Sequence, residues 1–114
     1  MAQLDQATAV KIQAPHFHKR LENVKISNSK PLVLKCEVKG TPTPTIFWRR
    51  DGQLLESCIS SYQNGVARLE VLGAGPGKGG VYECVAKNSV TEVTCSCHVT
   101  VTDPEGQSVC SGLV

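Results

Sequence analysis

Three short stretches decide the fold of this chain: LVLKCEV at residues 32–38, IFW at 46–48 and VYEC at 81–84. Successive side chains of a strand point to opposite faces, so the two leucines of the first stretch share a face with Cys36. Trp48 shares a face with Ile46, and Tyr82 shares a face with Cys84. Each stretch therefore predicts a strand whose buried row contains a cysteine or a tryptophan.

The composition favours an all-β domain. The chain has 114 residues, enough for one domain with a core, and contains only two Phe, two Tyr and one Trp. No long run has the 3.6-residue period of a helix, whereas short alternating runs are separated by Gly, Pro and Asn. The net charge of +2 is too small to indicate a nucleic-acid partner.

Working outward from these strands, we expect a flexible leader at residues 1–13, one domain at 14–102 and a linker or tail at 103–114. The first residues lack the basic and apolar regions of a signal peptide, and no apolar run is long enough to span a membrane. No Asn-x-Ser/Thr sequon is present. These features favour an intracellular location and argue against a membrane partner.

The alternation of apolar residues also predicts the core, which is shared between several strands. Its predicted members are Leu34, Trp48, Leu69, Val71 and Tyr82. Phe17 is expected to point inward from the first strand, between His16 and His18.

Beyond single strands, the chain resembles the immunoglobulin I-set family. The residues that carry this resemblance are Pro15-x-Phe17, Leu34-x-Cys36, Gly40-x-Pro42-x-Pro44-x-Ile46-x-Trp48-x-Arg50-Asp51-Gly52, Leu69-x-Val71, Gly80-x-Tyr82-x-Cys84 and Ala86-x-Asn88. Similar domains occur in titin, obscurin, palladin, myopalladin, myosin light-chain kinases and the striated-muscle preferentially expressed kinase.

This resemblance implies a sandwich of two antiparallel sheets with Greek-key topology. In such a fold the indole of Trp48 packs on a sulfur pair, Cys36 and Cys84, that joins the sheets, and Tyr82 forms the tyrosine corner. Four further cysteines have no such place: Cys58, Cys95, Cys97 and Cys110. Unpaired thiols are typical of a reducing compartment, where the Cys36–Cys84 pair is itself open to reduction.

The sequence departs from the family pattern at two positions. Lys78 stands four residues before the corner tyrosine, where the family usually has an aspartate that pairs with an arginine; we therefore expect that ion pair to be absent. Thr91 replaces a usual glycine in the last hairpin, where a β-branched residue disfavours a left-handed turn. Both changes predict altered loops and a less stable domain.

Three patterns resemble phosphate- or metal-binding sites, but each is better explained by its position in a loop or strand. Residues 75–80 match Gly-x-Gly-x-x-Gly, but a predicted strand follows them, and a phosphate site needs a helix there. Cys95 and Cys97 share the face of the core valines and fit packing better than metal binding. His16 and His18 lack a third ligand nearby. We expect no catalytic residues, metal or cofactor in this chain.

The remaining hypothesis is protein binding. Side chains alternate between the two faces of a strand, and this alternation predicts four residues on the outer face of the sheet that contains Trp48: Phe47, Arg49, Val85 and Lys87. Protein interfaces favour such a mixture of aromatic, apolar and basic residues. An alternative is that neighbouring segments cover Phe47. A rival basic surface around Lys35 and Lys39 would suit actin.

The sequence thus favours a non-catalytic protein-interaction and spacer module from a larger cytoskeletal or sarcomeric protein, with a kinase as one candidate parent. Its partners would be other proteins and neighbouring domains of that parent. The alternative function is an extracellular domain of an adhesion molecule or receptor.

Overall fold

A computed structural model of the chain describes residues 11–27, 30–55, 58–71 and 76–102. Its strands are β1 (Gln13–Lys19), β2 (Val24–Ser27), β3 (Leu32–Thr41), β4 (Thr45–Arg50), β5 (Gln53–Leu54), β6 (Ile59–Gln63), β7 (Val66–Val71), β8 (Gly80–Lys87) and β9 (Glu92–Thr102), with one short 3₁₀ turn, η1 (Pro76–Lys78). Most of the predicted leader and the whole predicted tail lie outside the described residues. In the described part, no helix is long and apolar enough to cross a membrane.

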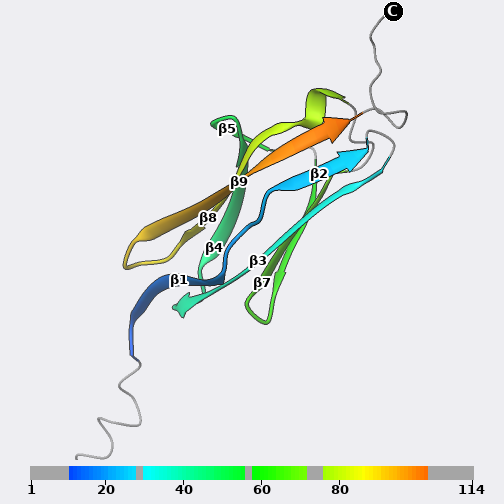
Figure 1. Cartoon of the computed structure of the whole chain (residues 1–114). Helices are drawn as coiled ribbons and strands as arrows, with labels where there is room; N and C mark the ends of the chain where they lie inside the picture. The colour runs from blue at the N-terminus through cyan, green and yellow to red at the C-terminus, as the bar shows by residue number, and fades with distance from the viewer. Residues whose placement is uncertain (1–10, 28–29, 56–57, 72–75, 103–114) are drawn as a thin grey trace, which may run out of the picture.

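The strands form two sheets packed face to face, as predicted (Figure 1). One sheet has the order β1-β3-β7-β6 and the other the order β2-β9-β8-β4-β5. One pairing differs from the antiparallel expectation, because β2 runs parallel to β9. The chain changes sheets between β1 and β2, and β2 then lies beside β9 in the five-stranded sheet.

The core lies between the sheets and is built by alternation. β3 shows a strict buried–exposed pattern over its first eight residues, and its inward row is Leu32, Leu34, Cys36 and Val38. The structure buries every residue that the sequence placed in the core: Leu34, Trp48, Leu69, Val71 and Tyr82. Phe17 is also buried, with His16 and His18 exposed beside it.

The corner before β8 is closed by Tyr82. Its hydroxyl donates a hydrogen bond to the carbonyl oxygen of Lys78 over 2.5 Å, which is the expected tyrosine corner. The segment that matches the letters of a phosphate loop enters strand β8 at Gly80, and its first residue, Gly75, lies outside the described residues. Because a strand and not a helix follows, no helix N-terminus is available to a phosphate there.

The last hairpin, between β8 and β9, shows how the chain accommodates Thr91. Among described residues other than glycine, only Asp51 and Asn64 have positive φ, so Thr91 does not adopt the left-handed conformation. Instead, the side-chain oxygen of Asn88 accepts the backbone N–H groups of Val90 at 2.9 Å and Thr91 at 3.4 Å. The Asn88 side chain therefore closes the turn without a glycine at Thr91.

Candidate functional site: the outer face of the five-stranded sheet

The candidate site is the solvent-facing surface of the five-stranded sheet, which we call the outer face. It is defined by Phe47, Arg49, Leu54, Glu83, Val85 and Lys87. Strand register brings these residues together: Phe47 lies opposite Val85, and Arg49 lies opposite Glu83. Phe47 remains 39% exposed in the described structure. An aromatic ring exposed to that extent on a sheet is available to a partner.

Val85 does not contribute exposed apolar surface, contrary to our expectation. It is only 2% exposed, although it lies outside the core between the sheets. It sits on β8, with Phe47 opposite on one side and Thr94 opposite on the other. Directly opposed side chains approach closely, so the short valine is sheltered between its neighbours. Parity identified the correct face of Val85 but did not predict its exposure.

Leu54 belongs to the outer face and was missed by the sequence analysis. It is 57% exposed and lies opposite Arg49. The signal was present in the sequence, because Asp51-Gly52 predicts a two-residue turn and such a turn fixes the register of both strands. The exposed apolar residues of the outer face are therefore Phe47 and Leu54.

A cross-strand ion pair lies beside these two apolar side chains, because Arg49 is opposite Leu54 on β5 and two residues from Phe47 along β4. The Nε atom of Arg49 is 3.2 Å from a carboxylate oxygen of Glu83, and the side chains are 37% and 27% exposed. The Nε atom itself is buried and makes no hydrogen bond of acceptable geometry in the described structure. The contact is therefore an ion pair rather than a well-formed hydrogen bond. It is partly screened by solvent.

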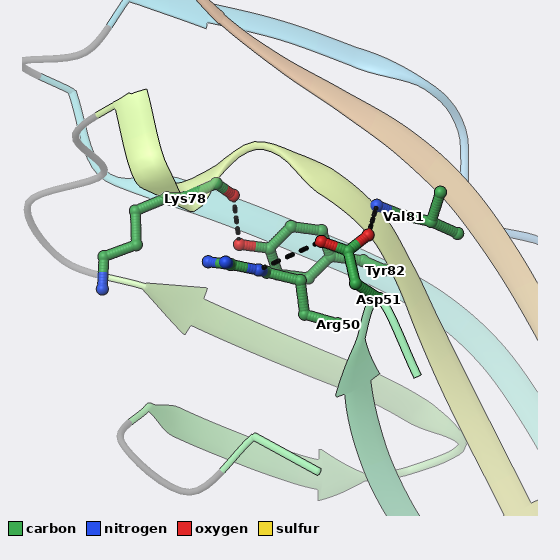
Figure 2. Close-up of polar contacts among 5 residues, drawn as sticks. All are labelled: Arg50, Asp51, Lys78, Val81 and Tyr82. Carbon is green, nitrogen blue, oxygen red and sulfur yellow. Dashed lines mark hydrogen bonds and ion pairs between the residues drawn. The ribbon is translucent and has the colours of Figure 1, made fainter. Parts of the chain in front are cut away.

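The turn at Asp51 and Gly52, which leads into β5 and Leu54, is hydrogen-bonded to the start of β8 (Figure 2). Asp51 donates its backbone N–H to the carbonyl of Val81 at 2.8 Å, and its carboxylate accepts the N–H of Val81 at 2.9 Å. Gly80, with φ +139°, lies so close that a Cβ atom there would stand 2.6 Å from that carboxylate. Reciprocal bonds and a close glycine hold the β4–β5 hairpin in place.

The same turn brings a different carboxylate to the corner from the one that the family usually has at position 78. Lys78 contributes only its backbone carbonyl to the corner, where it accepts the hydroxyl of Tyr82. An arginine and a carboxylate also meet there: Arg50 Nε lies 3.7 Å from an oxygen of Asp51 (Figure 2). The carboxylate comes from the hairpin turn rather than from position 78. Its side chain is 54% exposed, so this contact adds little stability.

At the end of the outer face, Phe47 also lines a shallow groove of about 470 Å³. Pro42, Thr43 and Lys87 are among its other lining residues. The amide of Asn88 donates hydrogen bonds to the carbonyls of Gln13 and Pro42, at 2.8 and 3.1 Å. Asn88 thus ties the first strand to the loop that forms this groove.

The cysteines of the core are free thiols and form one cluster. Its members are Cys36, Cys84, Cys95 and Cys97, all buried. A side-chain hydrogen bond to Cys84, together with burial, raises the pKa of Cys36 from 9.0 to about 12, against an opposing contact with Cys95. Burial, with a smaller effect of Cys95, raises the pKa of Cys97 to about 11. Such thiols stay protonated at neutral pH and behave as small apolar side chains.

The structure also places the other sequence candidates. His16 and His18 lie side by side with ring centroids 5.0 Å apart, and no cluster of three or more potential metal ligands occurs among the described residues. Lys35 and Lys39 are exposed on the outer surface of the four-stranded sheet, away from Phe47. Arg68 lies opposite Lys35 and extends that basic surface.

Residues 15–101 match the model of the immunoglobulin I-set domain. The chain belongs to this family. It is 34% identical over 99 residues to smooth-muscle myosin light chain kinase of Gallus gallus. It is 32% identical over 91 residues to the striated muscle preferentially expressed protein kinase of Danio rerio. These matches cover 87% and 76% of this chain but only 5% and 3% of the two kinases.

Solved structures show the same fold. One chain in a crystal structure of a titin domain in complex with an obscurin-like 1 immunoglobulin domain superposes with a TM-score of 0.78 and 30% identity. The match covers 82% of this I-set chain and 98% of that chain. The similarity to muscle proteins thus concerns one immunoglobulin domain and not the kinase part of the relatives.

Proposed function

We propose that this I-set domain is a non-catalytic protein-interaction and spacer module of a larger intracellular muscle or cytoskeletal protein, and that it binds its partner through the outer face. The observation that carries the proposal is the exposure of Phe47 and Leu54 next to Arg49 of the Arg49–Glu83 pair. Aromatic and arginine side chains are enriched at protein interfaces, and such a pair sets orientation. The similarity to a titin–obscurin-like 1 complex supports a protein partner.

The spacer role is supported by the path of the chain. Figure 1 shows β1 beginning at one end of the sandwich and β9 ending at the other. A domain that is entered and left at opposite ends can be placed in a linear array. We propose residues 14–102 as the unit of such an array, with residues 1–13 and 103–114 as its connections.

An extracellular adhesion domain remains the second candidate, because the I-set fold alone does not exclude it. The muscle kinases among the relatives and the four buried free thiols favour the intracellular function. Alkylation of the native protein with a membrane-impermeant thiol reagent, before and after denaturation, separates the two. A bridged Cys36–Cys84 pair in freshly isolated protein would support the extracellular function.

The outer face is tested with Phe47→Ser and Leu54→Ser. A partner captured from muscle lysate by the wild-type chain should bind each variant more weakly, by about tenfold or more if these residues anchor the interface. Val33→Ser is the matched control, because Val33 is 37% exposed on the other sheet and should leave binding unchanged. Equal loss in all three variants, or no loss in the first two, would contradict the proposal.

Salt dependence distinguishes the actin alternative. An apolar anchor should show modest sensitivity to salt, whereas a basic surface around Lys35, Lys39 and Arg68 should weaken steeply as salt rises. Co-sedimentation with filamentous actin across a salt series, using wild type and Lys35→Ala/Lys39→Ala, tests this. Strong actin binding that the lysine variant abolishes and Phe47→Ser retains would move the site to the four-stranded sheet.

A further inference from the structure

Four strands lie at the edges of the two sheets: β1 and β6 in one, β2 and β5 in the other. An edge strand presents unpaired N–H and C=O groups, and proteins usually protect it with proline, charge, irregular pairing or shortness. β1 contains Pro15 and two register irregularities. β2 has four residues with Lys25 among them, and β5 has two residues. Three of the described edges are therefore protected.

The fourth edge, β6, is one residue longer than β2 and lacks the proline, charge and irregular pairing that protect the other edges. Its sequence Ile-Ser-Ser-Tyr-Gln contains no charge and no proline. Its five residues pair with β7 in one uninterrupted register from Ile59 to Gln63. Ile59 is 55% exposed, and the serines and Gln63 are also exposed. β6 is thus a regular edge, open to another strand.

The turn after β6 determines which backbone groups are free. Asn64 and Gly65 have φ of 53° and 82°, and Gln63 lies opposite Val66 on either side of this two-residue turn. Such a turn is flanked by a hydrogen-bonded pair, and hydrogen-bonded and non-hydrogen-bonded pairs alternate along the ladder. The N–H and C=O groups of Ser60 and Tyr62 are therefore directed away from the sheet.

We infer that β6 is a pairing edge for a second copy of this chain, which adds its own β6 antiparallel across a two-fold axis at Ser61. In this register Ser60 lies opposite Tyr62 of the copy, so the free backbone groups meet in two hydrogen-bonded pairs. Ser61 then lies opposite Ser61 of the copy, on the outer surface of the four-stranded sheet.

Self-pairing is favoured because the strand is complementary to itself. No charged side chain of β6 opposes its copy, since all five residues are uncharged. Two charged residues of β7 face β6: Arg68 lies opposite Ser61, and Glu70 lies opposite Ile59. They are paired with each other at 3.2 Å. Tyr62 donates its hydroxyl to the Val38 carbonyl and so points inward, clear of the dyad. Small serines allow the two backbones to approach.

The paired strand is short, so the dimer should be weak and concentration-dependent. It uses the edge of the four-stranded sheet and does not involve Phe47 or Leu54. The dimer is therefore independent of the proposed outer-face partner, and either proposal can fail alone.

Sedimentation equilibrium of the full chain, from micromolar to millimolar concentration, tests the inference. Wild type should dimerise reversibly. Ser61→Lys places two like charges at the dyad, each beside an Arg68, and should weaken the dimer at least about fivefold. Mixing it with Ser61→Glu should restore a heterodimer, because opposite charges then meet at the axis. Ser61→Gln is the neutral control of similar length and should dimerise like wild type.

A second variant tests the backbone contacts. Ser60→Pro removes an outward N–H, which an edge strand tolerates, and should weaken the dimer about tenfold or more while the thermal melt stays cooperative. A wild type that stays monomeric at every concentration would overturn the inference. So would a dimer that Ser61→Lys leaves intact, or one that is lost in Phe47→Ser, which would place the contact on the outer face.

Discussion

The surfaces of the two sheets carry similar residues in different arrangements. On the five-stranded sheet, Phe47 and Leu54 both lie next to Arg49, whose ion pair with Glu83 joins β4 to β8. On the four-stranded sheet, the exposed apolar residues are Val33 and Ile59, and both lie opposite Glu70 of the strand between them.

This difference shows that register, rather than composition, decides whether exposed apolar residues form one surface. In the five-stranded sheet, the two exposed apolar residues, Phe47 on β4 and Leu54 on β5, both lie next to Arg49 on one face. In the four-stranded sheet, a carboxylate interrupts the row and pairs with Arg68 of its own strand. This difference supports our proposal of a partner surface on the first sheet, and we expect the face of the second sheet to be solvated, with pairing only at the β6 edge.

The largest expected effect tests the core that both surfaces share. Trp48→Ala removes the largest core side chain, 3% exposed in the structure. Such a change costs about 3–5 kcal/mol, against a total stability of about 5–15 kcal/mol for a typical domain. We expect loss of the cooperative thermal transition, or a large decrease in the urea midpoint. A melt within a few degrees of wild type would contradict the packing of the sandwich.

Alkaline pH tests the thiol cluster between the two sheets. The folded pKa of Cys97, about 11, and that of Cys36, about 12, both exceed the ordinary value of 9.0. At a pH between 9.0 and its folded pKa, each thiol keeps its proton in the native state and loses it in the unfolded state. The free energy of unfolding should therefore fall as the pH rises above about 9. The slope is about 1.4 kcal/mol per pH unit for each such thiol.

Urea unfolding in reducing buffer on either side of pH 9 measures this slope. Lysines and tyrosines also titrate in this range, so Cys97→Val is the control. It removes one buried thiol and should give a shallower decline than wild type. An identical slope in the variant would show that Cys97 does not contribute.

The next prediction separates buried from exposed residues of the outer face. Val85→Ala should lower the free energy of unfolding by about 1–3 kcal/mol, because the side chain is 2% exposed. Phe47→Ala should change it by no more than about 1 kcal/mol, because the ring is 39% exposed. Urea unfolding of the two variants compares them directly. A larger loss for Phe47→Ala would make the ring structural and weaken its assignment to a partner.

The smallest expected effect concerns the two ion pairs. Double-mutant cycles on Arg49–Glu83 and on Arg68–Glu70 should each give a coupling free energy below about 1 kcal/mol at low salt. Both pairs are partly exposed, with arginine side chains at 37% and 41%, so added salt should reduce the coupling. A much larger coupling for Arg49–Glu83 would mean that this pair mainly stabilises the fold rather than being available to a partner.

The sequence by itself determined the sandwich and its core. Cys36, Trp48 and Tyr82 lie in strands whose alternation is strong, and a period of two assigns each side chain to a face without knowledge of its neighbours. The resemblance of the motif around Trp48 to the I-set family was confirmed by the match of residues 15–101. Strand alternation was sufficient here because the buried residues of each strand are neighbours in sequence, at every second position.

Only the tertiary structure decided which residues of a face are exposed and which loops compensate for unusual residues. Val85 is covered by neighbours from β4 and β9, and Asp51 brings a carboxylate to the corner where Lys78 stands. The open edge at β6 likewise became visible only once the order of strands in each sheet was known. Exposure, loop compensation and edge position depend on contacts between residues far apart in the chain, and strand periodicity carries no information about them.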